Sequence, residues 1–208
     1  MTIEDRFVYL VDDDDSLRTA IKRMLDASGF KVCAYPSVAE FLMRRDRSHR
    51  GCLILDVRMP GGPSGLELQK ALADQGDNLP IIFLTGHGDI PMSVQVMKAG
   101  ASDFLTKPVE SDVLIDAINT ALDKEASVHR ISRRRRELAE SVARLTPAEL
   151  RVFQKIVEGH TNKKVADDLG CSERTVKAHR AKVMTKMGAA SLAELVQFSG
   201  YLSRKPNQ

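Results

Sequence analysis

The sequence has few cysteines and no long apolar run, and each shortage excludes a class of protein. Its three cysteines, Cys33, Cys52 and Cys171, are odd in number and widely spaced, so they indicate neither a disulfide framework nor a cysteine-ligated metal site. We expect each to be a small buried or half-buried residue. No stretch reaches the roughly 18 consecutive apolar residues typical of a membrane-spanning helix. The first residues also lack the charged-then-apolar pattern of a signal peptide, which predicts a cytoplasmic protein with no membrane segment.

Charge is distributed unevenly along the chain. The 208 residues carry a net charge of +3, but residues 1–125 hold 14 Lys and Arg against 20 Asp and Glu, whereas residues 126–208 hold 17 against 8. A positive field confined to one part of a chain attracts polyanions, so we expect the C-terminal part to bind nucleic acid. A basic surface without a ligand is the alternative. With 43% hydrophobic residues, a chain of this length is expected to form two small domains.

The first 125 residues alternate between apolar strand patterns and amphipathic helix patterns. Strands are expected at 7–11, 31–35, 52–55, 81–85 and 102–105, and helices at 16–27, 37–44, 64–73, 91–98 and from near 110 onwards. Strands that alternate with helices are joined by right-handed crossovers. The order therefore predicts an α/β fold, a doubly wound five-stranded parallel sheet with helices on both faces.

Polar side chains stand where the predicted strands end. The first strand runs into four aspartates at 12–15, the third into Asp56, the fourth into Thr85 and the fifth into Lys107. Clustered carboxylates at a sheet edge repel one another unless a cation is bound, and hard oxygen ligands suit Mg²⁺. Beside such an ion, the carboxylate of Asp56 can attack a phosphoryl group, which Lys107 could pair with and Thr85 could hydrogen-bond.

Each of these residues has a simpler interpretation when taken alone. Asp14 and Asp15 are typical of a solvated charge run that also caps a helix. Lys107 by itself is typical of a surface lysine, and Thr85 of a residue that ends a strand. Their joint placement at successive strand ends favours the shared site.

Five motifs at these positions resemble the receiver domain of two-component response regulators, the FixJ branch in particular, over residues 4–125. They are Val-Asp-Asp-Asp at 11–14, Leu-Asp-Val-Arg-Met-Pro at 55–60, Thr-Gly-His-Gly-Asp-Ile-Pro-Met at 85–92, Lys-Ala-Gly-Ala at 98–101 and Asp-Phe-Leu-Thr-Lys-Pro at 103–108. The resemblance implies a flavodoxin-like receiver fold in which Asp56 accepts phosphate from a sensor histidine kinase.

The same resemblance implies roles for the residues around the acceptor carboxylate, which would itself be a Mg²⁺ ligand. Asp13 would ligate the metal directly, Asp12 mainly through a metal-bound water, and Arg58 through its backbone carbonyl. Thr85 and Phe104 would form the switch pair. Phosphate would draw the Thr85 hydroxyl inward, and the ring of Phe104 would fill the space that it leaves.

Two local features depart from the family pattern. The loop Met59–Gly65, which contains Gly61-Gly62-Pro63, is one residue longer than is usual, and its effect on phosphorylation stays open. His87 could act as a metal ligand or a general base, but the glycines on both sides of it favour a mobile loop.

Residues 123–144 are predicted to form a helical linker because they contain no glycine or proline. Ile131, Leu138 and Leu145 recur every seven residues, which permits a short self-association seam, although arginines interrupt it. The run Arg133–Arg136 is either a solvated helical face or a contact to DNA phosphates.

Residues 145–208 are predicted to form a small all-α domain. Thr146 and Glu149 have the spacing of a capping box with a proline at the first helical position. A glycine turn at Gly170 separates a helix at 162–169 from one that Ser172 caps, which indicates a helix-turn-helix whose second helix enters the major groove. A last helix carries Leu192, Leu195, Val196 and Phe198. It would bury part of this apolar face in the domain, and the remainder of the face would either belong to the same core or contact a second copy of the chain.

Four motifs in this part resemble the LuxR-type output domain over residues 144–203. They are Leu-Thr-Pro-Ala-Glu at 145–149, Gly-His-Thr-Asn-Lys-Lys-Val-Ala at 159–166, Thr-Val-Lys-Ala-His-Arg at 175–180 and Ser-Leu-Ala-Glu-Leu-Val at 191–196. Family geometry implies that Lys177, Ala178 and Ala181 lie nearest the base edges. It also implies that five residues lie nearer the phosphates: Asn162, Lys163, Arg174, Thr175 and Lys182. Because Ala181 is small, few direct base contacts are expected and the target sequence cannot be inferred.

These patterns predict a receiver domain at 1–122, a helical linker at 123–144 and a LuxR-type helix-turn-helix domain at 145–208. The hypothesis is a transcriptional regulator that a histidine kinase phosphorylates on Asp56, that then forms a homodimer and binds promoter DNA, with RNA polymerase as a further candidate partner. Two rivals stay open. One is a constitutive DNA-binding protein with a silent receiver. The other is an aspartate-nucleophile phosphatase, which generally needs a second acid that Val57 and Arg58 do not supply.

Overall fold

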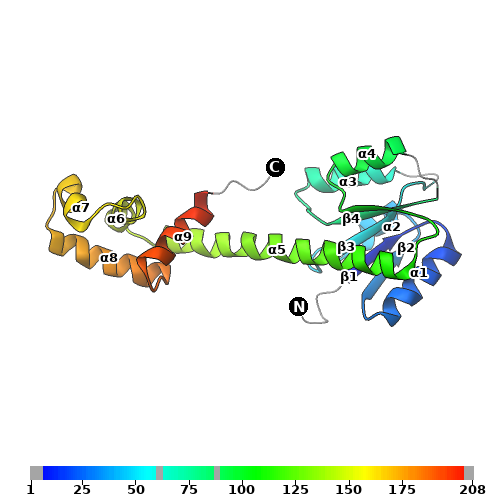
Figure 1. Cartoon of the computed structure of the whole chain (residues 1–208), viewed down its shortest axis with the longest axis horizontal. Coiled ribbons are helices and arrows are strands. Elements are labelled where there is room, and N and C mark those ends of the chain that lie inside the picture. The colour runs from blue at the N-terminus through cyan, green and yellow to red at the C-terminus, as the bar shows by residue number, and fades with distance from the viewer. Residues whose placement is uncertain (1–6, 60–62, 87–89, 204–208) are drawn as a thin grey trace. The chain divides into compact units, whose positions relative to one another are not determined.

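The structure of the chain is a computed structural model that describes residues 7–59, 63–86 and 90–203. It divides into two compact units, Met1–Ser127 and Val128–Gln208. Figure 1 shows the strands gathered in the first unit and helices alone in the second.

The first unit is a five-stranded parallel sheet in the order β2-β1-β3-β4-β5. Its strands are β1 (Phe7–Val11), β2 (Lys31–Tyr35), β3 (Gly51–Asp56), β4 (Ile81–Thr85) and β5 (Asp103–Thr106). The helices that follow them are α1 (Asp15–Ala27), α2 (Val38–Arg44), α3 (Gly65–Asp74), α4 (Ile90–Lys98) and α5 (Ser111–Ala143). The predicted doubly wound fold is confirmed, and the predicted element bounds differ from these by at most one residue.

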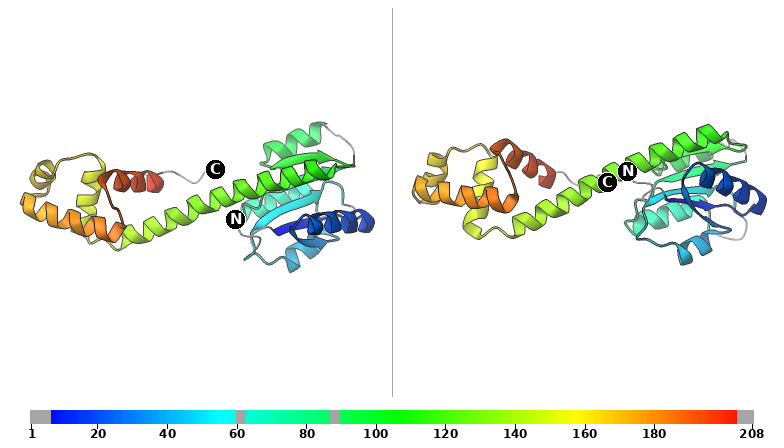
Figure 2. Two further views of the ribbon diagram at one scale, coloured as in Figure 1. Left: turned by 60° about the horizontal axis from the view of Figure 1, so that its bottom comes forward. Right: turned by 90° about the horizontal axis from the view of Figure 1, so that it is seen from below.

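Successive side chains of each central strand enter opposite cores, as a strand's two-residue period requires. In β1, Val8 and Leu10 pack on the side that α1 and α5 cover. Tyr9 and Val11 pack on the other side, which α2, α3 and α4 cover. The two views in Figure 2 let the reader follow these layers. Because both faces are covered, the central strands β1, β3 and β4 are almost entirely apolar, as parallel strands usually are.

The helices begin at the residues whose side chains can cap them. Asp14 caps α1, and its carboxylate accepts hydrogen bonds from the backbone N–H groups of Ser16 and Leu17, which confirms the capping role expected in the aspartate run. Ser64 and Glu67 form a reciprocal capping box at the start of α3. Such caps satisfy N–H groups that have no partner inside the helix.

The second unit is built from the end of α5 and from α6 (Pro147–Val157), α7 (Asn162–Leu169), α8 (Glu173–Met187) and α9 (Leu192–Ser203). Thr146 and Glu149 form the predicted capping box, and Gly170 ends α7 with a φ of 64°, a value that glycine adopts without strain. Its core joins Leu138 of α5 to residues of α6, α8 and α9.

The self-association seam that the heptad spacing permits therefore does not include Leu138. That side chain is only 2% exposed because it packs inside the second unit, whereas Ile131 is 49% exposed. Two members of the arginine run also have partners in their own unit. Arg133 pairs with Glu137 at 2.9 Å, and the guanidinium of Arg134 lies 4.8 Å from the ring centroid of Phe198.

All three cysteines are free, with Cys52 buried and the other two half-buried, as predicted. Burial raises the pKa of the Cys52 thiol to about 12, so that it stays protonated at neutral pH. Within the residues described, none of the helices combines the length and the apolar character needed to cross a membrane.

Candidate functional site

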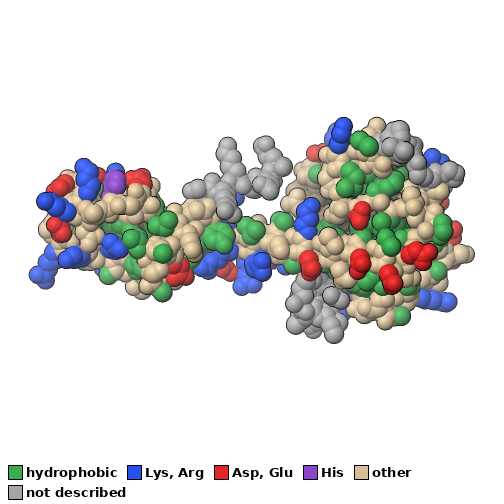
Figure 3. Space-filling model, viewed as in Figure 1, with side chains coloured by type: hydrophobic (Ala, Val, Ile, Leu, Met, Phe, Trp, Pro, Cys, Tyr) green, Lys and Arg blue, Asp and Glu red, His purple; other side chains and the backbone are tan. Residues whose placement is uncertain are grey.

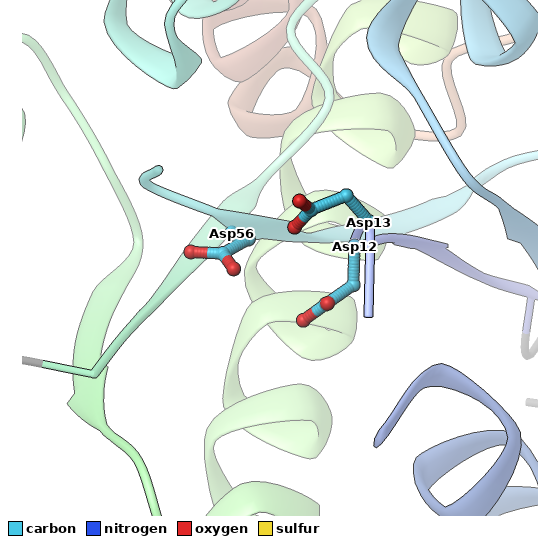
Figure 4. A group of neighbouring side chains, drawn as sticks. All are labelled: Asp12, Asp13 and Asp56. Atoms are coloured by element: carbon cyan, nitrogen blue, oxygen red, sulfur yellow. The ribbon is translucent and has the colours of Figure 1, made fainter. Parts of the chain in front are cut away.

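Three carboxylates meet at the carboxyl edge of the sheet, beside the point where the strand order reverses. Asp56 is the last residue of β3, and Asp12 and Asp13 directly follow the neighbouring strand β1. Figure 4 shows the three side chains together at this edge. One oxygen from each lies within 4.8 Å of the others; Asp12 and Asp56 are buried and Asp13 is exposed. Open α/β sheets bind ligands at such a switch point.

Lys107 joins two of these carboxylates. Its Nζ lies 2.7 Å from Oδ2 of Asp12 and 2.7 Å from Oδ2 of Asp56. Burial lowers the pKa of Lys107, but hydrogen bonds and charge from the two aspartates outweigh burial and raise that pKa above its ordinary value of 10.5. A permanent ammonium therefore offsets part of the negative charge that the cluster concentrates.

The backbone fixes the other oxygen of each buried carboxylate. The N–H of Asp14 donates to Oδ1 of Asp12 at 2.9 Å, and the N–H of Arg58 donates to Oδ1 of Asp56 at 3.0 Å. Arg18 of α1 donates to the backbone carbonyl of Asp12 at 2.7 Å. The carboxylates are thus oriented before any ligand binds, and such preorganisation favours both metal binding and nucleophilic attack.

The two residues predicted to act as a switch lie on adjacent strands. Thr85 ends β4 and is buried, and its carbonyl accepts a 2.6 Å hydrogen bond from the N–H of Lys107. Phe104 is half-buried on β5, where it pairs in register with Phe83 and packs on the side of the sheet that α2, α3 and α4 cover. Their switching role stays a prediction.

The structure brings together Asp12, Asp13, Asp56, Thr85 and Lys107, as the sequence predicted. Arg58 is exposed, and the predicted role of its carbonyl is untested. Gly61-Gly62 of the longer loop and His87 lie outside the described residues. The bridging position of Lys107 and the contact from Arg18 were not predicted, because neither follows from a spacing along the chain.

The carboxylates fit a divalent cation. Their oxygens are hard ligands and lie within 4.8 Å of one another. Asp13 is exposed to solvent, which suits Mg²⁺ because this ion usually keeps several of its bound waters. Asp12, Asp13 and Asp56 are the residues that would hold the ion.

The second unit presents a basic face along α8. Val176, Val183 and Met187 are buried, and α8 packs against α6 and α7. The side chains that α8 exposes include most of the predicted DNA contacts: Arg174, Thr175, Lys177, Ala178, Ala181 and Lys182. These residues recur at the three- and four-residue spacing that places them on one side of a helix.

Two further predicted contacts lie at the start of α7, where Lys163 is exposed and Asn162 is half-buried. The Thr175 hydroxyl lies 2.9 Å from that of Ser172, which caps α8. Figure 3 shows lysine and arginine side chains clustered on the second unit and acidic side chains gathered on the first. This basic helix-turn-helix can bind a polyanion through its phosphates.

Two family profiles match the chain, and they match different units. The profile described as "Response regulator receiver domain" matches residues 8–119. The profile described as "Bacterial regulatory proteins, luxR family" matches residues 143–199. Together they cover most of the sequence.

Relatives of similar length match both parts. The transcriptional regulatory protein FixJ of Azorhizobium caulinodans is 44% identical over 192 residues, which cover 92% of this chain and 90% of FixJ. The response regulator protein TodT of Pseudomonas putida is 42% identical over 190 residues, which cover 91% of this chain and 83% of TodT. Among solved structures, the response regulator StyR matches with a TM-score of 0.84 and 42% identity, over 94% of this chain and 98% of StyR. Full-length FixJ from B. japonicum gives a TM-score of 0.59 at 38% identity, over 94% of this chain.

Proposed function

The chain belongs to the two-component response regulators that carry a LuxR-type DNA-binding domain, and from this premise we propose that phosphorylation of Asp56 switches its binding to promoter DNA. Members of this family are transcriptional regulators and not enzymes, which removes the phosphatase alternative. The observation that carries the proposal is the Asp12–Lys107–Asp56 bridge, with both N–O distances at 2.7 Å.

The geometry supports Asp56 as the nucleophile. Its Oδ1 is held by the N–H of Arg58 and its Oδ2 by Lys107, so the carboxylate cannot rotate freely away from the sheet edge. An oxygen of Asp56 attacks the phosphorus of a phosphohistidine on a sensor kinase. A P–O bond forms, the P–N bond breaks, and the leaving histidine nitrogen takes up a proton.

The residues around Asp56 stabilise the transferred group. Mg²⁺ held by Asp12, Asp13 and Asp56 would neutralise charge on the phosphoryl oxygens. The ammonium of Lys107, which donates to Asp56 in this structure, can donate instead to a phosphoryl oxygen. The hydroxyl of Thr85, a buried residue at the end of β4, can donate to another phosphoryl oxygen. The movement of Thr85 and Phe104 would then carry the change to β5 and to α4.

The proposed response is dimerisation followed by DNA binding. α4 exposes Val94 and Met97, each 46% accessible, and we propose this face for contact between two phosphorylated copies. Two recognition helices, one from each copy, would then meet half-sites about one helical turn apart. We propose that the chain divides into a receiver at 1–122, a linker at 123–144 and an output domain at 145–208. We also propose that the protein acts in the cytoplasm, where it can bind promoter DNA, and that RNA polymerase is a downstream partner.

Intact-mass measurement with Mg²⁺ and acetyl phosphate tests the first step. We expect one phosphoryl adduct on the wild-type chain, none on Asp56→Asn, and an adduct on the control Asp15→Asn, whose exposed carboxylate pairs with Arg18 outside the cluster. The same adduct on Asp56→Asn would contradict the assignment. No adduct on any variant, with DNA binding retained, would favour the silent receiver.

A further inference from the structure

A side-chain hydrogen bond joins the two helices of the helix-turn-helix. Nη1 of Arg180 on α8 donates to Oδ1 of Asn162, the first residue of α7, at 3.1 Å. The two residues are 18 apart in sequence, and both are half-buried. Arg180 was not among the predicted DNA contacts, whereas Asn162 was expected to lie near a phosphate.

This hydrogen bond decides which part of the Asn162 side chain remains free. An asparagine amide has one acceptor oxygen and an NH₂ group with two donors. Turned outward, the oxygen would repel a DNA phosphate, whereas the NH₂ group would donate to it. Because Arg180 holds the oxygen in place, the NH₂ group is the part of the amide that remains available to a phosphate. Lys163, the next residue, is exposed and adds positive charge at the same end of α7.

We propose that Arg180 is a positioning residue for DNA binding. It fixes the amide of Asn162 so that its NH₂ group donates to a backbone phosphate, and it acts through Asn162 without reading a base. The inference rests on the proposed function. It adds Arg180, which is half-buried and so not part of the exposed face of α8, to the residues that DNA binding requires. Because phosphates are the same in every sequence, the effect should not depend on the target promoter.

A double-mutant cycle on the full chain tests this inference. The probe is a short fluorescent duplex of arbitrary sequence at low salt, with affinity measured by anisotropy after treatment with Mg²⁺ and acetyl phosphate. We expect Asn162→Ala and Arg180→Ala each to weaken binding about tenfold, the loss of one hydrogen bond to a charged group. The double variant should be no weaker than either single variant, because both changes remove the same contact.

Lys182→Ala is the matched control, since Lys182 is exposed on the same helix and is expected to contact a phosphate by itself. Combined with Asn162→Ala, it should multiply the two losses, to about a hundredfold. Asn162→Asp gives a second readout. Its carboxylate still accepts from Arg180 but meets the phosphate with negative charge, so this variant should fold like the wild type and bind DNA more weakly than Asn162→Ala.

Melting curves confirm that each variant is folded before its affinity is compared. If the losses from Arg180→Ala and Asn162→Ala multiply, or if Asn162→Asp binds as tightly as the wild type, the inference fails while the proposed function stands. If the wild-type chain does not bind the duplex, both fail.

Discussion

Replacing Leu138 by alanine should destabilise the DNA-binding unit although Leu138 lies on the helix that begins in the receiver. Its side chain is 2% exposed and belongs to the core that includes Val152, Phe153 and Phe198. Arg134, one turn earlier, lies over the ring of Phe198. The end of α5 is therefore part of the second unit's core and more than a spacer.

The expected loss is large for a unit of this size. A buried leucine replaced by alanine costs about 2–5 kcal/mol in lost burial and in the cavity that remains. A small domain has about 0.05–0.15 kcal/mol of stability per residue, so about 3 kcal/mol is a substantial share of the total. With roughly 4–8 °C of melting temperature per kcal/mol for such a domain, we expect a decrease of about 12–24 °C.

Hydrogen exchange followed by mass spectrometry can assign the effect to one unit of the intact chain. Amides of α6 and α8 should exchange faster in Leu138→Ala, and those of the sheet should be unchanged. Ile131→Ala is the control on the same helix, because Ile131 is 49% exposed and should cost less than about 1 kcal/mol. Unchanged exchange in α6 and α8, or equal effects of the two variants, would refute the reasoning.

Three further predictions concern single contacts. In Gly51→Ala the new Cβ would collide with the backbone carbonyl of Phe7 on the neighbouring strand, so urea unfolding should show a loss of at least about 2 kcal/mol for the receiver, and an unchanged midpoint would contradict this. A hydrogen bond from the Lys186 ammonium, and after it one from the backbone N–H of Thr146, lower the pKa of Glu149 from 4.5 to about 2. The contribution of the ionised Glu149 to stability is therefore complete above about pH 4.5 and declines as the pH falls towards 2. Melting curves of Glu149→Gln should show a shallower decline of stability over that interval. Lys107→Ala removes a cation that competes with Mg²⁺ for the two carboxylates, so calorimetry should show Mg²⁺ binding roughly three- to tenfold tighter, and weaker binding would count against the site.

Local chemistry made most of the fold predictable. Apolar runs of four or five residues fixed the strands, and caps such as Ser64 and Thr146 fixed where helices begin. The meeting of Asp12, Asp56 and Lys107 also followed from sequence, because parallel strands bring their carboxyl ends to one edge.

Contacts between distant side chains were not predictable in the same way. The heptad spacing of Leu138 is equally consistent with a seam between two copies and with a core inside one unit, and only the packing of α6 and α9 distinguishes these. Arg180 and Asn162 are 18 residues apart, and no periodicity relates them. Lys107 was expected to meet a phosphate, but its place between two carboxylates depends on the exact register of β1, β3 and β5.

The central claim is that phosphate on Asp56 controls DNA binding. The most direct test measures the affinity of the full chain for promoter DNA, with and without acetyl phosphate in the presence of Mg²⁺. We predict that the wild-type chain binds at least about tenfold more tightly when phosphorylated, a coupling of about 1.4 kcal/mol, and that Asp56→Asn shows no change. Equal affinities of the wild-type chain under both conditions, with the phosphoryl adduct present, would contradict the account.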